Sequence, residues 1–205
     1  MNTNPDIHLE MQGSVAVVRL TRPTKRNALN DGLIASLRHI FENLPKEARV
    51  AVVAGEGEHF CAGLDLSELK ERDAGEGVYH SRSWHVALDR VQSGPVPVIA
   101  ALHGAVVGGG LELASACHIR VADESTFYAL PEGTRGIFVG GGGAVRIPRL
   151  IGGTFKVDMS KGGFIKRMSK LQGEHERFFA WVAANRAGEL KQRSSDMRAQ
   201  GAAML

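Results

Sequence analysis

Cysteine is scarce in this sequence. The 205 residues include two cysteines, Cys61 and Cys117, which stand in apolar surroundings without the spacing of metal ligands. We therefore expect two buried thiols in a reducing compartment, because neither a disulfide framework nor a zinc site fits this pattern. Long hydrophobic runs are also missing, since no uninterrupted apolar stretch approaches the roughly 18 residues that a membrane helix needs.

The N-terminus shows no targeting pattern. The segment MNTNPDIHLE has neither the basic start nor the apolar centre of a signal peptide. Together with the lack of a membrane-spanning run, this predicts a cytoplasmic protein that does not insert into a membrane.

No charge of one sign dominates, because the net charge at pH 7 is +3. Residues 1–152 hold 15 Lys and Arg against 17 Asp and Glu, whereas residues 153–205 hold 10 against 5. The basic C-terminal part lacks the interleaved aromatics of a base-stacking surface and any recognisable recognition helix, so we expect a solvated face and no nucleic-acid partner. The change in composition predicts a core domain over 1–152 and a divergent segment over 153–205, helical around 178–190.

The first part has enough apolar residues for a sizeable core, since 43% of the chain is hydrophobic. Short β-branched runs predict strands at 15–20 and 50–55, and residues 30–44 between them place their apolar side chains on one helical face, with Asn30 as the N-cap. The later strands are predicted at 98–102, 118–123 and 126–130. Helices are predicted around 84–91, after Gly110, and after a run of four glycines at 140–143. This alternation predicts an α/β domain with mostly parallel strand pairing.

Three consecutive glycines, Gly108 to Gly110, precede a short apolar helix that carries a single acid. Such a turn can bind phosphate, because backbone N–H groups and the helix dipole both point at the anion. A P-loop would require lysine where Gly110 stands, and a dinucleotide fingerprint would require glycine where Leu113 stands. Both phosphate-binding motifs therefore fail at a residue that carries their chemistry.

The remaining use of this turn is an oxyanion hole, in which an N–H at a helix N-terminus stabilises negative charge on a carbonyl oxygen. An oxyanion hole needs a second donor. In HFCAGLDL, the glycine before Leu64 allows the backbone to turn so that the Leu64 N–H points into the same cleft.

Two acids are candidates for proton transfer. Glu112 lies three residues after Gly109, about one helical turn along the same helix, and Glu132 in LPEG is presented where a strand ends. Two carboxylates in one cleft can divide the roles of general acid and general base, with burial raising the pKa of one of them. Structural alternatives stay open: Glu112 can pair with Arg120 or Arg135, and Glu132 can complement a helix dipole.

Four separated motifs occur in an order that resembles the crotonase superfamily, also called the enoyl-CoA hydratase/isomerase family. They are LTRPTKRNALN, HFCAGLDL, HGAVVGGGLELA and FYALPEGTRGIFVGGGGAVRIPRLIG, and they lie within residues 15–152. The resemblance implies an α/β fold in which repeated β-β-α units form a spiral, followed here by a divergent, helical C-terminal tail.

The resemblance also implies roles for individual residues. The two backbone N–H groups that hold the thioester oxygen of an acyl-CoA fall on Leu64 and Gly109, and the two hydratase glutamates fall on Glu112 and Glu132. Arg135 stands beside them and could contact a polar acyl group. The positions implied to bind CoA are Lys25, Arg26, Ala28, Ala62, Asp65 and Leu66. No metal and no separate cofactor is implied, because coenzyme A is part of the substrate.

Retention of both acids favours hydration of a 2-enoyl-CoA, or the reverse dehydration. Double-bond isomerisation, thioester hydrolysis, and a catalytically impaired CoA-binding paralogue remain alternatives. The resemblance implies C-terminal helices that close the acyl pocket and build a homotrimer or dimer of trimers. The sequence after Gly152 does not resemble the part of the family sequence that forms these helices. We expect that assembly only if the tail permits it. A frameshifted or otherwise divergent terminus is our hypothesis, which sequencing of the coding DNA tests.

Overall fold

The computed structural model describes residues 4–68, 73–135 and 137–151 of the chain. The basic segment 153–205, including the helix predicted around 178–190, lies outside the described residues. The domain boundary near Gly152 therefore stays a prediction.

A five-stranded sheet forms one layer of the fold, with the strand order β1-β2-β3-β4-β6. Its members are β1 (Ile7–Gln12), β2 (Val15–Leu20), β3 (Val50–Gly55), β4 (Val98–Leu102) and β6 (Ile119–Ala122). Strand β1 pairs antiparallel with β2, and every other neighbouring pair is parallel. The predicted parallel pairing is thus confirmed. Strand β1 was not predicted from the sequence, although Ile7, Leu9 and Met11 alternate with polar residues in it.

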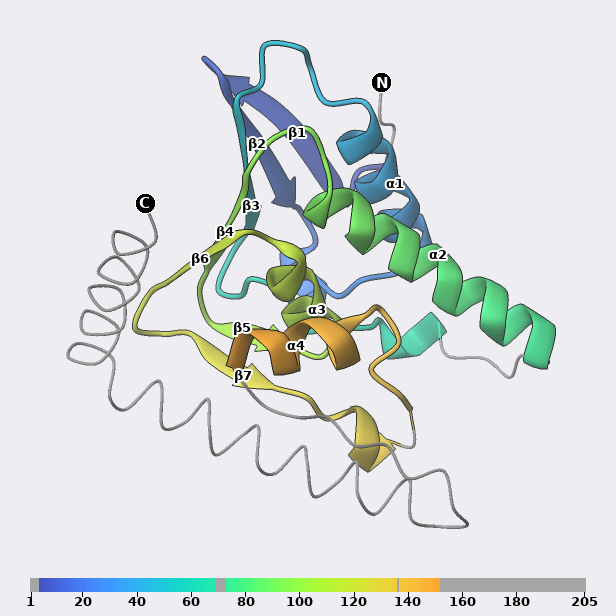
Figure 1. Cartoon of the computed structure of the whole chain (residues 1–205). Coiled ribbons are helices and arrows are strands. Elements are labelled where there is room, and N and C mark those ends of the chain that lie inside the picture. Colours follow the sequence, from blue (N-terminus) through green and yellow to red (C-terminus); the bar gives the residue numbers. More distant parts are fainter. Residues whose placement is uncertain (1–3, 69–72, 136, 152–205) are drawn as a thin grey trace, which may run out of the picture.

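A smaller sheet lies below the first and consists of β5 (Ala105–Val107) and β7 (Phe127–Ala129), paired in parallel (Figure 1). An isolated parallel bridge between Cys61 and Val106 adds a third segment beside β5. The chain thus repeats a unit in which one strand joins the large sheet, the next strand joins the small sheet and a helix follows. The segments β4-β5-α3 and β6-β7-α4 are two such units. These are the expected β-β-α units.

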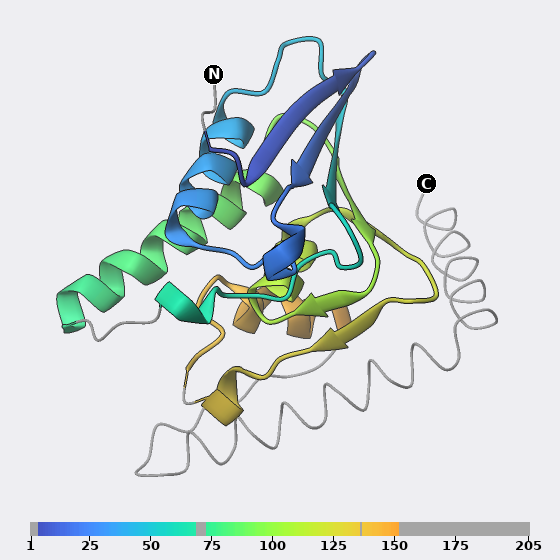
Figure 2. The same cartoon turned by 180° about the vertical axis from the view of Figure 1, so that it is seen from behind.

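Helix α1 (Asp31–Glu42) begins where the sequence predicts it, because the Leu33 N–H donates to the Asn30 side chain over 2.7 Å. Helix α2 (Ala74–Gln92) starts well before the predicted residue 84. A capping box, in which Asp73 and Glu76 satisfy each other's backbone N–H groups, supports its first turn. The two helices lie side by side on one side of the large sheet in both views (Figures 1 and 2).

Helix α3 (Gly109–Ala116) is buried along its whole length, between β5, α2 and α4 (Gly143–Ile151). Three short 3-10 helices complete the described elements: η1 (Pro23–Lys25), η2 (Leu66–Glu68) and η3 (Glu132–Arg135). The central position of α3 explains why its residues are almost all small or apolar, and it makes the burial of Glu112 on the same helix exceptional.

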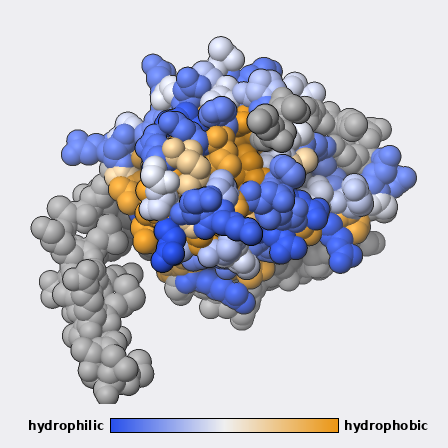
Figure 3. Space-filling view, turned by 90° about the horizontal axis from the view of Figure 1, so that it is seen from above, coloured by the Kyte–Doolittle hydropathy of each residue, from blue (hydrophilic) through white to orange (hydrophobic). Residues whose placement is uncertain are grey.

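Both cysteines are free and buried, as predicted, and burial raises the pKa of each thiol to about 12. The face seen in Figure 3 is largely hydrophilic, with hydrophobic residues reaching the surface in a band between hydrophilic ones. Among the described residues, no helix is both long enough and apolar enough to cross a membrane.

Candidate active site

A pocket of about 260 Å³ brings together the oxyanion and acid residues that the sequence singles out. The described residues that line it are Leu64, His80, Ser81, Trp84, Gly109, Glu112, Glu132, Ile137, Phe138, Gly140 and Gly141. They come from four separate parts of the chain: the segment after β3, helix α2, helix α3 and the loop between β7 and α4.

The backbone amides of Leu64 and Gly109 lie at this pocket. Leu64 is held in a parallel bridge with Leu29, in which the Leu29 N–H donates to the Gly63 carbonyl oxygen over 2.7 Å. Gly109 is the first residue of α3, so its N–H has no acceptor within the helix. Within the described residues, neither of these two N–H groups donates to another protein group. Both are thus available to an oxygen in the pocket.

Close packing requires glycine at two positions around the start of α3, the N-cap residue and the second residue of the helix. Gly108 has a φ of 54°, a left-handed conformation that favours glycine, and a Cβ there would lie 2.7 Å from Oε1 of Glu132. A Cβ on Gly110 would collide with the Cys61 carbonyl oxygen. The requirement for glycine at 110 is therefore one of packing, whereas the glycine at 108 makes room for a carboxylate of the pocket.

Glu112 is 4% exposed, and its Oε1 accepts a 2.8 Å hydrogen bond from the Gly143 N–H. Burial raises the pKa of this carboxyl to about 7, and the negative charge of Glu132 acts in the same direction. Hydrogen bonds from the Gly143 and Gly141 amides and the positive charge of Arg146 oppose that rise. A carboxyl with this pKa exchanges protons readily near neutral pH.

The structural alternative in which Glu112 forms an ion pair with Arg120 is wrong. The Arg120 guanidinium instead donates to the carbonyl oxygens of Ala114, Cys117 and His118. The other proposed partner, the Arg135 side chain, lies outside the described residues, as does any contact it makes with an acyl group.

Glu132 is 6% exposed and begins η3, directly after Pro131. The Gly108 N–H donates to the Ala129 carbonyl oxygen over 2.9 Å, which attaches the end of β7 to the start of α3. This attachment brings the two predicted acids to the same pocket. The position of Glu132 at the start of a 3-10 helix also fits the alternative role of an acid that complements a helix dipole.

The six residues expected to bind CoA form a continuous region beside Leu64. The Ala62 N–H donates to the Arg26 carbonyl oxygen over 2.9 Å, which joins the segment around Lys25 and Ala28 to the segment that ends at Leu66. Lys25, Arg26 and Leu66 are exposed. Their role in CoA binding stays a prediction.

The Asp65 carboxylate already has partners within the chain. It is 3.0 Å from Arg22 Nη2 and accepts a 2.6 Å hydrogen bond from the Ser67 hydroxyl. The Ser67 hydrogen bond is the main cause that lowers the pKa of Asp65 to about 2. Asp65 therefore contributes by holding the loop, because its carboxylate is ionised and satisfied.

The residues that form the rest of the pocket wall were not predicted from the sequence. Trp84 donates its indole N–H to Asp31 Oδ1 over 3.1 Å, and His80 Nε2 is 2.8 Å from the same oxygen. The helical periodicity around Trp84 was a signal for a helix but not for a pocket, and Phe138 lies in a loop without periodicity. No cluster of three or more His, Cys, Asp or Glu suited to a metal ion occurs in the described part of the chain.

Comparison with known proteins defines the class. The model of the family "Enoyl-CoA hydratase/isomerase" matches residues 10–163, which is most of the chain. The chain belongs to this family and thereby to the crotonase superfamily, so the predicted membership and fold class are confirmed.

Individual relatives agree with this class. A Bacillus subtilis strain 168 protein named "Putative enoyl-CoA hydratase/isomerase YngF" is 41% identical over 144 residues, covering 67% of this chain and 54% of that protein. The Short-chain-enoyl-CoA hydratase of Clostridium acetobutylicum is 36% identical over 150 residues, covering 72% and 58%. A crystal structure of a "putative enoyl-CoA hydratase" from Rhodopseudomonas palustris CGA009 is 60% identical with a TM-score of 0.71, covering 73% and 58%. The chain thus matches little more than half the length of each.

Proposed function

We propose that this chain carries the catalytic residues of an enzyme that adds water to a 2-enoyl-CoA thioester, or removes it in the reverse direction. One observation supports this most directly. Two backbone N–H groups without protein acceptors among the described residues and two buried glutamates line the same pocket. The names of two relatives, a short-chain-enoyl-CoA hydratase and a putative enoyl-CoA hydratase, refer to the same reaction.

In the proposed reaction, the N–H groups of Leu64 and Gly109 hold the thioester oxygen. They stabilise the negative charge that forms on it when a nucleophile attacks the conjugated double bond. These donors are already in place in the folded backbone, so little reorganisation is needed when the charge develops.

Glu112 and Glu132 complete the proposed addition. One carboxylate takes a proton from water, the hydroxyl bonds to C3 of the acyl group, and the other carboxyl delivers a proton to C2, so that one water molecule is consumed. The pKa of Glu112, raised to about 7, lets this group give or take a proton near neutral pH. The apolar side chains of Leu64, Trp84 and Ile137 provide a surface for the acyl chain.

Coenzyme A enters as part of the substrate, and we propose no separate cofactor or metal. Its phosphates would meet the exposed basic side chains of Lys25 and Arg26. For the assembly we propose a homotrimer or a dimer of trimers, which size-exclusion chromatography with light scattering measures directly.

The test mixes the full chain with crotonyl-CoA and with longer and aromatic 2-enoyl-CoAs, and follows the absorbance of the conjugated thioester. Hydration removes that absorbance. No decrease with any substrate, while calorimetry shows that CoA binds, would refute the hydratase and support a CoA-binding paralogue. Release of free thiol would support a hydrolase, and conversion of a 3-enoyl-CoA with no hydration would support an isomerase.

A further inference from the structure

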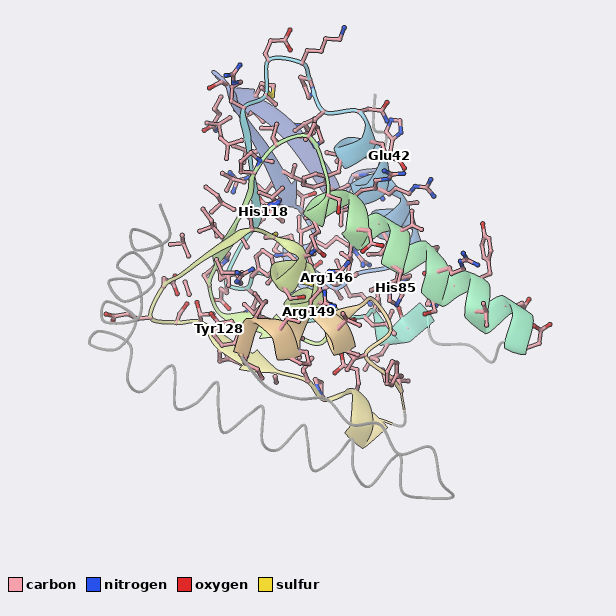
Figure 4. The ribbon with its side chains drawn as sticks, in the orientation of Figure 1. Glu42, His85, His118, Tyr128, Arg146 and Arg149 are labelled. Carbon is pink, nitrogen blue, oxygen red and sulfur yellow. The ribbon has the colours of Figure 1, made fainter. Side chains whose placement is uncertain are left out.

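Arg146 is a buried cation that lies outside the lining of the candidate pocket. The residue is 8% exposed, and each of the three guanidinium nitrogens has a partner. Nε donates to Gln92 Oε1 over 2.6 Å, Nη2 forms an ion pair with Asp89, and Nη1 donates to the Gly141 carbonyl oxygen over 2.8 Å. Figure 4 shows Arg146 where α4 comes close to α2, next to His85.

These contacts attach the loop before α4, which contains Gly140 to Gly142, to α2. Asp89 and Gln92 belong to the last turns of α2, whereas Gly141 belongs to the loop before α4. Gly142 has a φ of 97°, and a Cβ on it would collide with the Arg146 guanidinium. The side chain of Arg146 thus lies directly against the loop and fixes it from behind.

The other side of this loop, together with Gly143 at the start of α4, contacts Glu112. Besides donating the 2.8 Å hydrogen bond to Oε1, Gly143 packs so closely that a Cβ on it would lie 2.7 Å from Glu112 Cγ. A Cβ on Gly141 would lie 3.1 Å from Glu112 Oε2. Because no space remains between the loop and this carboxyl, the position of the loop determines the position of Glu112.

We propose that Arg146 is a positioning residue of the catalytic site, which holds the Gly141–Gly143 loop against Glu112 by tying it to α2. The inference rests on the proposed function. It assigns to Arg146 no contact with substrate, because Arg146 acts through the loop.

The charge of Arg146 makes this role measurable. The charged groups that act on Glu112 are Glu132 from η3, which raises its pKa, and Arg146 from α4, which lowers it. On α2, Asp89 pairs with Arg146, and His85 lies beside it. Removing the positive charge should therefore raise the pKa of Glu112, and loosening the loop should lower the rate.

The experiment compares Arg146→Gln and Arg146→Lys with Arg149→Gln, which removes an exposed charge from the last turn of α4. We expect Arg146→Gln to lower kcat about 10- to 100-fold with little change in KM, the size of effect that slight misplacement of a catalytic group produces. The limb of the pH–rate profile that reports Glu112 should move to higher pH. Arg146→Lys should restore that limb without restoring the full rate, and Arg149→Gln should match the wild type.

A further variant loosens the anchor without changing charge. Gln92 is exposed, so Gln92→Ala should fold normally even if Arg146→Gln does not. We expect a lower kcat at every pH, with the pH limb unmoved. A wild-type kcat and pH profile in both Arg146→Gln and Gln92→Ala would overturn the proposal, and so would a wild-type kcat in Gln92→Ala if Arg146→Gln fails to fold.

A separate readout distinguishes failure of this inference from failure of the proposed function. If the wild type hydrates no enoyl-CoA, the proposed function fails, and the Glu112 carboxyl is then titrated by carbon-13 NMR in the wild type and in Arg146→Gln. A higher pKa of Glu112 in the folded variant supports the coupling of Arg146 to this group. An unchanged titration overturns it.

Discussion

Gly63 lies so close to Gly109 that there is little room for a side chain between them, although the two residues belong to distant segments of the sequence. A Cβ on Gly63 would lie 3.3 Å from the Gly109 backbone nitrogen and 2.8 Å from the Val107 carbonyl oxygen. The contact places Leu64, the residue after Gly63, beside the start of α3. The spacing between the two proposed oxyanion donors therefore depends on the absence of a side chain at position 63.

This contact predicts that Gly63→Ala lowers activity and stability together. Gly13→Ala is the matched control, because Gly13 also has a positive φ, 61° against 95° for Gly63, and a Cβ there would meet nothing within 4 Å. Both variants should lose about 1–2 kcal/mol from the left-handed conformation, and Gly63→Ala should lose more through its contacts. Urea denaturation and the hydration assay measure both effects. Equal stability losses and unchanged activity would contradict the role of the contact.

The two glutamates should both be needed for hydration. Glu112→Gln and Glu132→Gln keep the shape of each side chain but remove its ability to transfer a proton, so each should lower kcat about 10²- to 10⁴-fold. Steady-state rates with crotonyl-CoA measure this, with the exposed Glu124→Gln as the control. A Glu112→Gln enzyme with nearly normal activity would favour an isomerase-like reaction that uses one acid.

Stability should depend on pH through Glu112. Its pKa is about 7 in the folded chain against an ordinary value of 4.5, so between these values the folded state retains a proton that the unfolded state releases. The free energy of unfolding therefore falls as the pH rises through this window, by about 3 kcal/mol in total. Glu112→Gln lacks this loss, so its stability relative to the wild type should rise between pH 5 and pH 8. Urea denaturation at both values checks this, and a constant difference would disprove it.

His80 should affect substrate binding more than turnover. It lines the pocket and shares the Asp31 carboxylate with Trp84, but it is neither of the two acids. We expect His80→Ala to raise KM about fivefold, which corresponds to the loss of about one hydrogen bond's net free energy, with kcat nearly unchanged. His39→Ala, on the exposed side of α1, is the control. A fall in kcat with unchanged KM would assign His80 to the chemistry instead.

The two thiols should be unreactive in the folded chain. Cys61 and Cys117 are the only cysteines, both are buried, and burial raises their pKa to about 12, so little reactive thiolate forms at pH 8. Ellman's reagent should detect almost no fast-reacting thiol in the native protein and two per chain in guanidinium chloride. Fast reaction of either thiol without denaturant would contradict the burial.

The amino-acid sequence by itself determined most of the strands and helices and singled out Glu112 and Glu132 as the candidate acids. The β-branched runs predicted β2 and β3, and the prolines before Val98 excluded a helix there and so predicted β4. The Asn30 cap predicted the start of α1, and the glycine turn predicted α3. Each of these depends on local propensity or periodicity. The short strand β5 and the first half of α2 were missed, since three residues show no period and Gly75 and Gly77 weaken a helical pattern.

Only the tertiary structure decided how these parts form one site. The sequence left open whether Glu112 pairs with Arg120. The structure instead shows the Gly143 N–H donating to Glu112 and Arg146 donating to the Gly141 carbonyl oxygen. It also placed His80 and Trp84 of α2 at the pocket. These contacts join residues far apart in the chain, and their geometry follows from the close packing of α2, α3 and α4, which no local pattern encodes.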